Sequence, residues 1–366
     1  MKRIVLTGGG SAGHVTPNLA LVPGLEAAGV ECFYIGTENG IEKSLVKDIP
    51  FYSIEAGKLR RYLSRENVSD VFRTVRGRNE ALRILRELRP DLVFAKGGYV
   101  SVPVVYAAHK LKIPIVLHES DFTPGLANRL CMRKAKEICL TFDSKEAHGG
   151  KGILTGSPVR PSLLEGSAER GRGFLGFDGS RPVLLIMGGS LGAQAVNEVV
   201  DAAMDELLAS YDIVHLRGRG NLNPALEGRR GYRQFEYISD ELPDVFQAAD
   251  IALSRAGANA LVELTALQIP PLLVPLPLSA SRGDQILNAR YYTAQGLAAM
   301  IDQDALTPDT LIAALADLYA RRDEIMEKMR SSKNLDGTGN VLAVLLNELN
   351  LPGGPHEPSG QTATET

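Results

Sequence analysis

The amino-acid sequence predicts an α/β protein of two doubly wound, Rossmann-like domains that face one another across a cleft. Two glycine-rich turns lie about half a chain apart: residues 4–7 lead into the first glycine turn (residues 8–13), and residues 184–187 lead into the second glycine turn (residues 188–193). A buried strand, a tight glycine turn and a helix start are typical of a phosphate-binding βα unit. The length of 366 residues supports two domains, since about 150 residues make a typical domain.

Apolar runs of strand length alternate with helical patterns along both halves. In the first half these runs cover residues 4–6, 32–35, 92–95, 115–118 and 137–140. In the second half they cover residues 183–187, 213–216, 234–238, 251–254 and 272–276. Such alternation predicts a parallel sheet in each half, with helices on its faces.

The domain boundaries are predicted from composition. Residues 156–181 hold several prolines and glycines and are the expected crossing between the domains. We therefore expect a first domain at residues 1–160, a second at residues 161–335, and a helix at residues 336–350 that packs back toward the first domain. The small, polar residues 351–366 are expected to be disordered.

Composition and charge exclude several classes of protein. The 40 basic and 43 acidic residues leave a net charge of −3, which argues against a nucleic-acid-binding protein. Three cysteines form neither a metal-spaced cluster nor an even disulfide set, and they indicate a reduced compartment. The first residues run straight into a predicted strand with no apolar signal-peptide segment, so no signal peptide is expected, and no run approaches the ~20 apolar residues that span a bilayer. No acid pair has the spacing of a divalent-metal site, so neither a metal nor a cofactor is predicted.

The first glycine turn ends at a candidate catalytic residue, His14, where the next helix begins. A neutral imidazole with an unperturbed pKa near ~6.5 could take a proton from a hydroxyl nucleophile. The alternative is that His14 only hydrogen-bonds the turn. No acidic residue stands clearly at the end of the second strand to hold a dinucleotide ribose, so a nicotinamide dehydrogenase is the weaker interpretation.

Two further loops are expected at the same sheet edge. The third glycine turn (residues 96–101, with Tyr99) and the loop at residues 118–121 each follow a strand. Together with the first glycine turn they predict an acceptor pocket, although turns needed only for packing are the alternative. Asp121 either hydrogen-bonds a sugar hydroxyl or only precedes the next helix.

The second half offers a candidate nucleotide site. Residues 254–260 are small and lead into a helix that bears Glu263. A ligand could approach this helix N-terminus closely, and the carboxylate could accept hydrogen bonds from both ribose hydroxyls. A solvated glutamate is the alternative. Asp284 and Gln285 begin a later helix and either contact sugar hydroxyls or, in the case of Asp284, cap that helix.

These motifs resemble the MurG family, the peptidoglycan glycosyltransferases of glycosyltransferase family 28. The match runs from residue 1 to about residue 349 and rests on the ordered motifs GGGSAGHVTP, YIGTENGIEKSLV, KGGYVSVPVVYAA, HESDFTPGLAN, TGSPVR, GGSLGAQAVN, SRAGANALVE and DQILNA. Each motif alone is weak, but their joint order is highly specific.

The resemblance implies a GT-B fold and an inverting transfer of N-acetylglucosamine. The donor would be UDP-N-acetylglucosamine (UDP-GlcNAc) and the acceptor undecaprenyl-diphosphate-linked muramoyl-pentapeptide, the step from lipid I to lipid II. This step belongs to peptidoglycan and cell wall synthesis, and so to cell shape, cell division and the cell cycle. Helix N-termini and Arg160 would stabilise the departing diphosphate without a metal.

The resemblance also implies roles for individual residues. In the first domain, His14 is the base or transition-state partner for the acceptor hydroxyl, and Ser11, Ala12 and Gly13 line the same loop. The donor-binding positions of the second domain are Arg160 and Ser190 for diphosphate and nucleotide, Ile238 through its backbone for uracil, Ala258, Asn259, Ala260, Leu261 and Val262 at the nucleotide-binding helix start, Glu263 for ribose, and Asp284 with Gln285 for the sugar.

Two residues depart from the family pattern. Asp121 and Asp284 stand where Asn and Gln are common in the family. An ionised carboxylate accepts hydrogen bonds but cannot donate them. Sugar recognition is therefore rearranged in this chain, or Asp121 shares the base role with His14.

A basic segment at residues 58–89 predicts a membrane contact. It holds ten basic and four acidic residues, with Leu59, Tyr62, Leu63, Val71 and Phe72 as apolar contacts. Given the lipid acceptor that the resemblance implies, we expect a peripheral enzyme whose first domain meets anionic lipid on the cytoplasmic side of the cell membrane. A solvated helical face is the alternative.

Three rival functions stay open at this point. A sugar-nucleotide epimerase would share the two-domain cleft and a UDP site but would need no lipid acceptor. A glycosyltransferase acting on diacylglycerol would keep the membrane face. A non-enzymatic UDP-sugar-binding scaffold would bind the donor and would not need His14.

Overall fold

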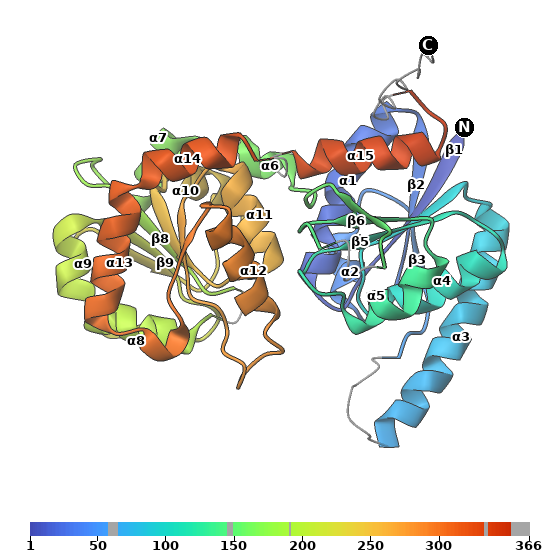
Figure 1. The fold of residues 1–366 in the computed structure, drawn as a ribbon, viewed down its shortest axis with the longest axis horizontal. Coiled ribbons are helices and arrows are strands. Elements are labelled where there is room, and N and C mark those ends of the chain that lie inside the picture. The colour runs from blue at the N-terminus through green and yellow to red at the C-terminus, as the bar shows by residue number, and fades with distance from the viewer. Residues whose placement is uncertain (58–64, 145–148, 190–191, 333–335, 353–366) are drawn as a thin grey trace, which may run out of the picture. The chain divides into compact units, whose positions relative to one another are not determined.

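The computed structural model describes residues 1–57, 65–144, 149–189, 192–332 and 336–352. The chain forms two compact units. Unit 1 comprises Met1–Glu119, Pro124–Pro158 and Asp336–Thr366, and unit 2 comprises Ser120–Thr123 and Val159–Leu335. Figure 1 shows that each unit is a sheet flanked by helices.

Unit 1 contains a seven-stranded parallel sheet in the order β3-β2-β1-β4-β5-β6-β7. The strands are β1 (Lys2–Thr7), β2 (Val30–Gly36), β3 (Phe51–Ser53), β4 (Leu92–Ala95), β5 (Ile115–Glu119), β6 (Glu137–Leu140) and β7 (Gly152–Leu154). All five strands predicted for this half are present. The sequence analysis missed β3 and β7, because three-residue edge strands are too short to show a periodic pattern.

Helices cover both faces of this sheet. They are α1 (Thr16–Ala27), α2 (Ile41–Leu45), α3 (Arg65–Leu88), α4 (Ser101–Lys110), α5 (Leu126–Cys131) and α15 (Gly337–Glu348), with 3₁₀ turns η1 (Ala12–His14) and η2 (Met132–Lys134). Alternate side chains of a strand point to opposite faces. Ile4 and Leu6 accordingly pack with α1 and α15, whereas Val5 packs with α3 and α4.

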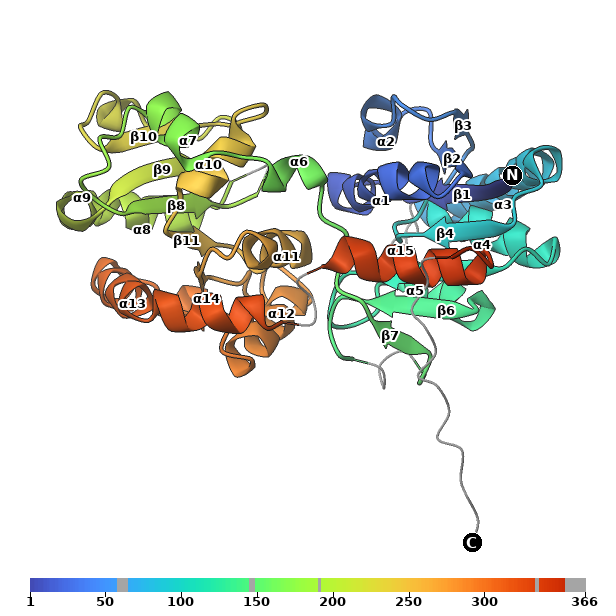
Figure 2. The same cartoon turned by 90° about the horizontal axis from the view of Figure 1, so that it is seen from above.

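The helix predicted near the end of the chain is α15, and it packs on α1 within unit 1 (Figure 2). The approach is close, since a Cβ atom on Gly24 would lie 2.4 Å from Leu342 Cδ1. Of residues 351–366, which were predicted to be disordered, Leu351 packs against the core beside α1 and α15, contrary to that prediction, and residues 353–366 lie outside the described residues.

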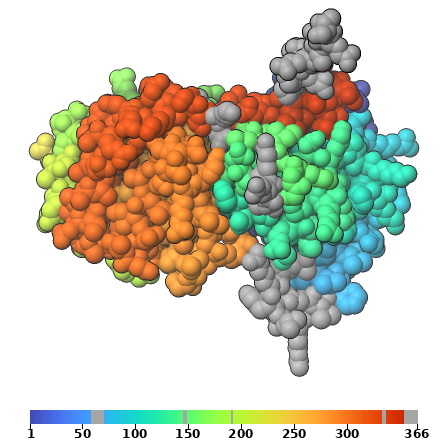
Figure 3. Space-filling view, in the orientation of Figure 1, coloured from blue at the N-terminus to red at the C-terminus, as the bar shows by residue number. Residues whose placement is uncertain are grey.

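Unit 2 contains a six-stranded parallel sheet in the order β10-β9-β8-β11-β12-β13. The strands are β8 (Val183–Met187), β9 (Asp212–Leu216), β10 (Tyr232–Phe235), β11 (Ile251–Ser254), β12 (Pro271–Leu273) and β13 (Ala299–Met300). Its α-helices are α6 (Pro161–Leu164), α7 (Ala168–Leu175), α8 (Gln194–Ala202), α9 (Met204–Ser210), α10 (Leu242–Ala248), α11 (Ala258–Ala266), α12 (Asp284–Ala294), α13 (Pro308–Ala320) and α14 (Arg322–Arg330), and short 3₁₀ turns are η4 (Pro224–Leu226) and η5 (Gln303–Ala305). The surfaces of α13 and α14 form much of the orange and red face of unit 2 in Figure 3.

Two predicted strands of this half are longer than the observed ones. The strand expected at 272–276 ends at Leu273, since Pro275 and Pro277 have no N–H to continue the ladder. The strand expected at 234–238 is β10, which starts earlier and ends at Phe235. Ile238 is nevertheless buried, in the core beside β10, so its apolar character reflects burial outside a strand.

The predicted crossing at residues 156–181 is only partly a connection. The chain leaves unit 1 after Pro158, and the rest of the segment forms α6 and α7, which pack on α10 within unit 2. Gly166 and Gly171 permit this packing, because Cβ atoms there would lie 2.1 Å from backbone oxygens of α10. Two of the glycines that suggested a linker are therefore close-packing positions.

Across the described ranges, none of the helices combines the length and apolar character that a bilayer span requires.

Candidate functional site

The first and third glycine turns interlock at the carboxyl edge of the unit 1 sheet, as predicted. They meet because β1 and β4 are neighbours in the sheet. A Cβ atom on Gly98 would lie 2.1 Å from the carbonyl oxygen of Gly9, and one on Gly10 would lie 2.7 Å from the ring of Tyr99. Gly98 has a φ of 77°, a left-handed conformation that favours glycine. These glycines are thus needed for the turns to touch.

His14 is oriented by the first glycine turn. Its Nδ1 lies 3.2 Å from the carbonyl oxygen of Gly9 and 3.0 Å from Ser11 Oγ. Because a carbonyl oxygen can only accept, Nδ1 carries the proton in this contact and Nε2 keeps a lone pair. Nε2 has no hydrogen-bond partner among the residues that the structure describes. The ring is therefore set up to accept a proton through Nε2.

The environment keeps this imidazole neutral. Burial and then the positive charge of Lys96 lower the pKa of His14 to about 4, against smaller opposing effects of Gly9 and Glu42. A neutral ring at pH 7 is the protonation state that a general base requires. His14 also hydrogen-bonds the turn, which was the alternative considered for it. That contact uses Nδ1 and leaves the lone pair of Nε2 available.

The buried carboxylate of Glu42, which the sequence analysis did not single out, stabilises the first glycine turn. Glu42 is fully buried and accepts hydrogen bonds from the Thr37 N–H (3.0 Å), the Thr37 hydroxyl (2.5 Å) and the Gly10 N–H (3.3 Å). A Cβ atom on Gly9 would lie 2.7 Å from this carboxylate. In the sequence Glu42 is one of several charged residues of a short helix, which gives no sign of burial.

Lys96, at the start of the third glycine turn, is also buried. Its Nζ lies 2.7 Å from His118 Nδ1 and 2.8 Å from Ser157 Oγ. His118 Nε2 donates to the carbonyl oxygen of Gly156 (2.9 Å), so Nδ1 accepts from the ammonium group. Burial and then Lys96 hold the pKa of His118 well below its usual value. His118 is thus neutral, and both of its ring nitrogens are hydrogen-bonded. It links β5 to Lys96 and to Gly156.

Asn128, on α5, places a hydrogen-bond acceptor without a described partner at the carboxyl edge of the unit 1 sheet. Its Nδ2 donates to the carbonyl oxygen of His118 (3.0 Å) and to Glu119 (2.9 Å). Its Oδ1 is buried and has no hydrogen-bond partner in the described part of the chain. A Cβ atom on Gly97 would lie 3.6 Å from both this oxygen and His14 Cδ2. Asn128 belongs to the motif HESDFTPGLAN but was not assigned a role from the sequence.

In unit 2, the second glycine turn follows β8. Gly189 and Gly192 have φ values of 86° and 76°, and the Gly192 N–H donates to the carbonyl oxygen of Gly189 (2.9 Å). A Cβ atom on Gly189 would meet no atom within 4 Å, so packing does not explain this glycine. Ser190, predicted to bind the donor, lies outside the described residues.

The N-terminus of α11 is open. Its first intrahelical hydrogen bond runs from the Leu261 N–H to the carbonyl oxygen of Gly257 (3.1 Å), so the N–H groups of Ala258, Asn259 and Ala260 have no intrahelical acceptor. A Cβ atom on Gly257 would meet nothing within 4 Å. The side chains of Ala258, Leu261 and Val262 are buried, so these residues can contact a ligand only through the backbone.

Glu263 and Arg160 influence each other electrostatically, and both are incompletely hydrogen-bonded. Burial raises the pKa of Glu263, while the charge of Arg160 lowers it. Glu263 makes no hydrogen bond with the residues that the structure describes, and Arg160 has a buried Nε without a partner there. A buried donor and a partly buried carboxylate without hydrogen bonds are costly unless a ligand completes them. The solvated-glutamate alternative for Glu263 is therefore wrong.

The two acids that depart from the family pattern lie on the same surface of unit 2. Asp284 binds Arg282 through Oδ2 (2.6 Å) and accepts the Thr123 hydroxyl through Oδ1 (3.0 Å). Asp121 Oδ1 accepts from Asn288 Nδ2 (3.2 Å), and Asn288 Oδ1 accepts the Phe122 N–H (3.1 Å). Segment Ser120–Thr123 is thus bound to α12, which the sequence analysis did not predict.

The simpler interpretation of Asp284 as a helix cap is wrong. Gly283 is the N-cap of α12, with a φ of 85°, and Asp284 is the first helical residue. Gln285 also has a local partner, since its Oε1 accepts the Leu276 N–H (3.0 Å). Ile238 is 3% exposed and packs in the core, so only its backbone is available to a ligand.

Two parallel α/β units with glycine turns at their carboxyl edges, one with a neutral histidine and the other with an open helix N-terminus beside Arg160 and Glu263, form the arrangement of a GT-B glycosyltransferase. The chain belongs to glycosyltransferase family 28. The model described as the glycosyltransferase family 28 N-terminal domain matches residues 4–140, and that of the C-terminal domain matches residues 183–340. The family predicted from the ordered motifs is confirmed.

Similar proteins carry a more specific name. A protein of Lachnospira eligens is 49% identical over 349 residues, 94% of this chain and 99% of its own, and is named "UDP-N-acetylglucosamine--N-acetylmuramyl-(pentapeptide) pyrophosphoryl-undecaprenol N-acetylglucosamine transferase". A Clostridium perfringens protein of the same name is 47% identical over 94% of this chain and 97% of its own.

Solved structures agree on the fold. The crystal structure of Acinetobacter baumannii MurG is 26% identical and covers 95% of this chain and 100% of its own, with a TM-score of 0.74. The Neisseria meningitidis UDP-GlcNAc 2-epimerase, bound to UDP-GlcNAc, covers 96% of this chain and 100% of its own at 15% identity, with a TM-score of 0.67. The epimerase likeness concerns the fold alone, as expected of two doubly wound domains.

Proposed function

We propose that this chain transfers N-acetylglucosamine from UDP-GlcNAc to the lipid-linked muramyl-pentapeptide of peptidoglycan synthesis. The observation that carries the proposal is the near-full-length identity of 46–49% with transferases of that name. The chemistry of the two units supports it, since unit 1 offers a neutral base and unit 2 offers Arg160, whose buried Nε has no partner among the described residues, together with the partly buried carboxylate of Glu263.

In the proposed reaction His14 is the base. The acceptor hydroxyl attacks the anomeric carbon, the new C–O bond forms as the bond to the UDP oxygen breaks, and the configuration at carbon inverts. The hydroxyl proton passes to His14 Nε2, whose lone pair is free in the described structure. Ser11, Ala12, Gly13 and Tyr99 line the acceptor side.

Unit 2 holds the donor in this proposal. The open N-terminus of α11, the second glycine turn with Ser190, and Arg160 with its unsatisfied Nε face the diphosphate and stabilise the charge that develops on departing UDP. Glu263 accepts the two ribose hydroxyls, and the backbone of Ile238 contacts uracil. This electrostatic set supports leaving-group departure without a metal ion.

The sugar contacts need a rearrangement relative to the usual amides. In this chain Asp284 and Gln285 are already bonded to Arg282, Thr123 and Leu276. Asp284 therefore orients Arg282 and segment Ser120–Thr123 beside the sugar, and Gln285 still has its amide NH₂ to offer to a sugar hydroxyl. Asp121 likewise acts through Asn288 or contacts the sugar directly.

The decisive experiment measures label transfer. Purified full-length protein is incubated with radiolabelled UDP-GlcNAc and the lipid-linked muramyl-pentapeptide in the presence of EDTA. Label in the lipid fraction supports the proposal and its metal independence. A folded protein that binds UDP without labelling this lipid would contradict it, and tests with diacylglycerol, or for epimerised UDP-sugar, would then separate the remaining alternatives.

Transfer should persist well below pH 6. The base must be neutral, and the pKa of His14 is lowered from 6.5 to about 4 by burial and then by the charge of Lys96. As the pH falls, kcat/KM should therefore decline only as it approaches 4. Lys96→Met removes the positive neighbour and should move this decline to higher pH, whereas Lys110→Met, at an exposed site on α4, should not. A wild-type decline centred near 6.5 would contradict the assignment.

We also propose a peripheral contact of unit 1 with anionic lipid on the cytoplasmic face of the cell membrane, where the lipid acceptor would be met. The part of α3 that the structure describes supports it: Val71, Phe72 and Val75 are exposed, as are Arg73 and Arg76. Part of this helix faces the viewer in Figure 3. Leu59, Tyr62 and Leu63 lie outside the described residues.

The proposed step makes the chain part of cell wall synthesis and, through it, of cell shape and division.

Phe72→Ser should weaken binding to phosphatidylglycerol-containing vesicles. Phe72 is 71% exposed, so the change costs the fold little. Burial of a phenylalanine side chain contributes about 1.5–3 kcal/mol, and we expect about a tenfold lower partition coefficient in a vesicle sedimentation assay. Leu222→Ser, at an exposed apolar residue of unit 2, is the matched control. Equal loss in both variants, or none in either, would exclude α3 as the membrane contact.

A further inference from the structure

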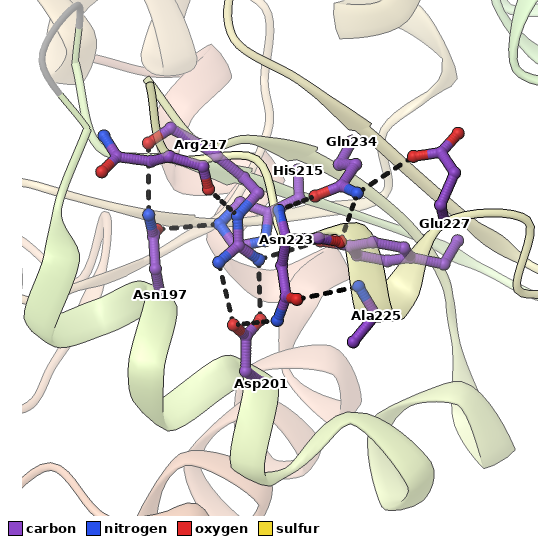
Figure 4. A network of polar contacts seen from close by, with 10 residues as sticks. Asn197, Asp201, His215, Arg217, Asn223, Ala225, Glu227 and Gln234 are labelled. Carbon is purple, nitrogen blue, oxygen red and sulfur yellow. Dashed lines mark hydrogen bonds and ion pairs between the residues drawn. The ribbon is translucent and has the colours of Figure 1, made fainter. Parts of the chain in front are cut away.

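A buried arginine holds the end of β9 in unit 2. Arg217 directly follows this strand, at the carboxyl edge where parallel α/β sheets bind ligands. It is 4% exposed, and its Nη1 and Nη2 donate to Asp201 Oδ1 (2.6 Å) and Oδ2 (2.8 Å). Figure 4 shows this two-pronged contact, with Asp201 on α8. The ion pair therefore joins α8, the helix that follows the second glycine turn, to the loop after β9.

The backbone of the same residue touches the second glycine turn. A Cβ atom on Gly192 would lie 2.0 Å from the carbonyl oxygen of Arg217, so only a glycine allows this approach. The same carbonyl oxygen accepts from Asn197 Nδ2 (3.2 Å), one turn before Asp201 on α8. Arg217 is thus bound to α8 through both its side chain and its backbone, and any shift of Arg217 would be transmitted to Gly192.

Further hydrogen bonds limit how Arg217 can move. Its Nε donates to the carbonyl oxygen of Asn221 (2.5 Å) and its Nη1 to the Tyr232 hydroxyl (3.2 Å). His215 lies between the Tyr232 hydroxyl (Nδ1, 3.1 Å) and Asn197 Oδ1 (Nε2, 3.0 Å). All three guanidinium nitrogens donate hydrogen bonds, two of them to Asp201 as Figure 4 shows, and lysine could not reproduce this geometry.

The charges in this cluster are those of an ion pair at neutral pH. Burial raises the pKa of Asp201, but hydrogen bonds from Arg217 and Asn223 outweigh it and leave this pKa below its usual value. Burial and then the charge of Arg217 lower the pKa of His215 to about 3. His215 is therefore neutral, and within the described part of the chain Asp201 is the carboxylate that pairs with the buried guanidinium.

We infer that the Arg217–Asp201 ion pair is a positioning element for the donor diphosphate, which holds Gly192 and the N-terminal half of α8 in the shape that accepts it. This inference rests on the proposed function, which assigns the second glycine turn to the diphosphate of UDP-GlcNAc. Arg217 and Asp201 act through Gly192 and Asn197 and do not themselves bind the phosphate. Their loss should weaken nucleotide binding more than it weakens the fold.

The same strand supplies a matched control. At the opposite end of β9, Asp212 is bound by Arg181, whose Nη2 lies 2.6 Å from its Oδ1. Asp212 is also buried, with a side chain that is 4% exposed. Removing Arg181 therefore disrupts a comparable ion pair on the same strand but away from the carboxyl edge. A purely structural role for Arg217 predicts the same consequences from both substitutions.

The experiment measures UDP binding to the full chain by calorimetry, together with thermal unfolding. Arg217→Met and Asp201→Asn should each raise the Kd of UDP about tenfold, the lower end of the about 10–100-fold loss seen when the partners that orient metal-binding groups are removed. The Kd of Arg217→Lys should lie between those of wild type and Arg217→Met. Arg181→Met should lower Tm without changing the Kd. In the transfer assay KM for UDP-GlcNAc should rise, while KM for the lipid acceptor stays unchanged.

The outcomes separate this inference from the proposed function. If wild type binds UDP and Arg217→Met binds it equally well, or no more weakly than Arg181→Met, the inference is overturned and the proposed function stands. If wild type does not bind UDP, both fall. Asp201→Asn is nearly isosteric and keeps the test valid should Arg217→Met fail to fold. A double variant that loses no more affinity than either single one would support a single positioning unit.

Discussion

Replacing His14 by alanine is expected to reduce kcat of the transfer by about 10²–10⁴, the usual contribution of a positioned general base. The reason is specific to one atom: Nδ1 is held by Gly9 and Ser11, while Nε2 keeps its lone pair. Binding of UDP should be unchanged, because unit 2 holds the proposed nucleotide site. The measurement is initial-rate transfer of label to the lipid acceptor, with calorimetric UDP binding on the same preparation.

Two further variants sharpen this result. His14→Asn keeps a donor that can reach the Gly9 carbonyl oxygen but supplies no basic nitrogen, so it should be as inactive as His14→Ala. His109→Ala, at an exposed histidine near the end of α4, should retain wild-type activity. If His14→Asn kept most of the activity, the histidine would only shape the turn, and proton removal would have to be assigned elsewhere, with Asp121 the first residue to test.

Replacing Glu263 by alanine is expected to lower kcat/KM for UDP-GlcNAc by about 100-fold, since hydrogen bonds to a charged group contribute about 1.5–3 kcal/mol each. The carboxylate is partly buried, and no described residue hydrogen-bonds it. The substrate offers a direct check. A donor that lacks the 2′-hydroxyl of the uridine ribose should be a poor substrate for wild type, yet Glu263→Ala should discriminate little between the two donors.

This comparison is a double-mutant cycle with one change in the protein and one in the ligand. Glu206→Ala, at an exposed glutamate of α9, is the control and should discriminate between the donors as wild type does. Additive losses from Glu263→Ala and the deoxy donor would mean that the carboxylate does not contact the ribose. In that case its raised pKa would reflect burial alone.

Sequence patterns predicted the long elements well because their periodicity reflects burial. The strands of four or more residues were all found, although the limits of β10 were shifted. The edge strands β3, β7 and β13 were missed. The glycine turns were equally predictable, because a positive φ and a close backbone contact leave glycine as the suitable residue at Gly98 and Gly192. The prolines and glycines of residues 156–181 led to the prediction of a connection where the chain forms α6 and α7. Glycine is found at close helix contacts as well as in turns, so its presence alone does not indicate a linker.

The ionisable groups show where sequence reasoning ended. His14 and Glu263 were found because each stands in a recognisable motif. The acidic character of Asp121 and Asp284 was noted, but their partners were not, since Asn288 and Thr123 lie more than 160 positions away along the chain. Glu42 and Lys96 read as ordinary charged residues of a helix and a loop. Their burial depends on neighbours that only the fold assembles.

By itself the sequence determined the fold class, the family and the residue types at the two edges, because strand periodicity, glycine turns and motif order are local properties of the chain. The tertiary structure decided the electrostatic state of those residues. It made His14 neutral by burying it near Lys96, left Arg160 Nε without a partner, and set Arg217 against Gly192. A pKa, an unsatisfied donor and a backbone contact all depend on distances between remote segments, and those distances exist only once the chain has folded.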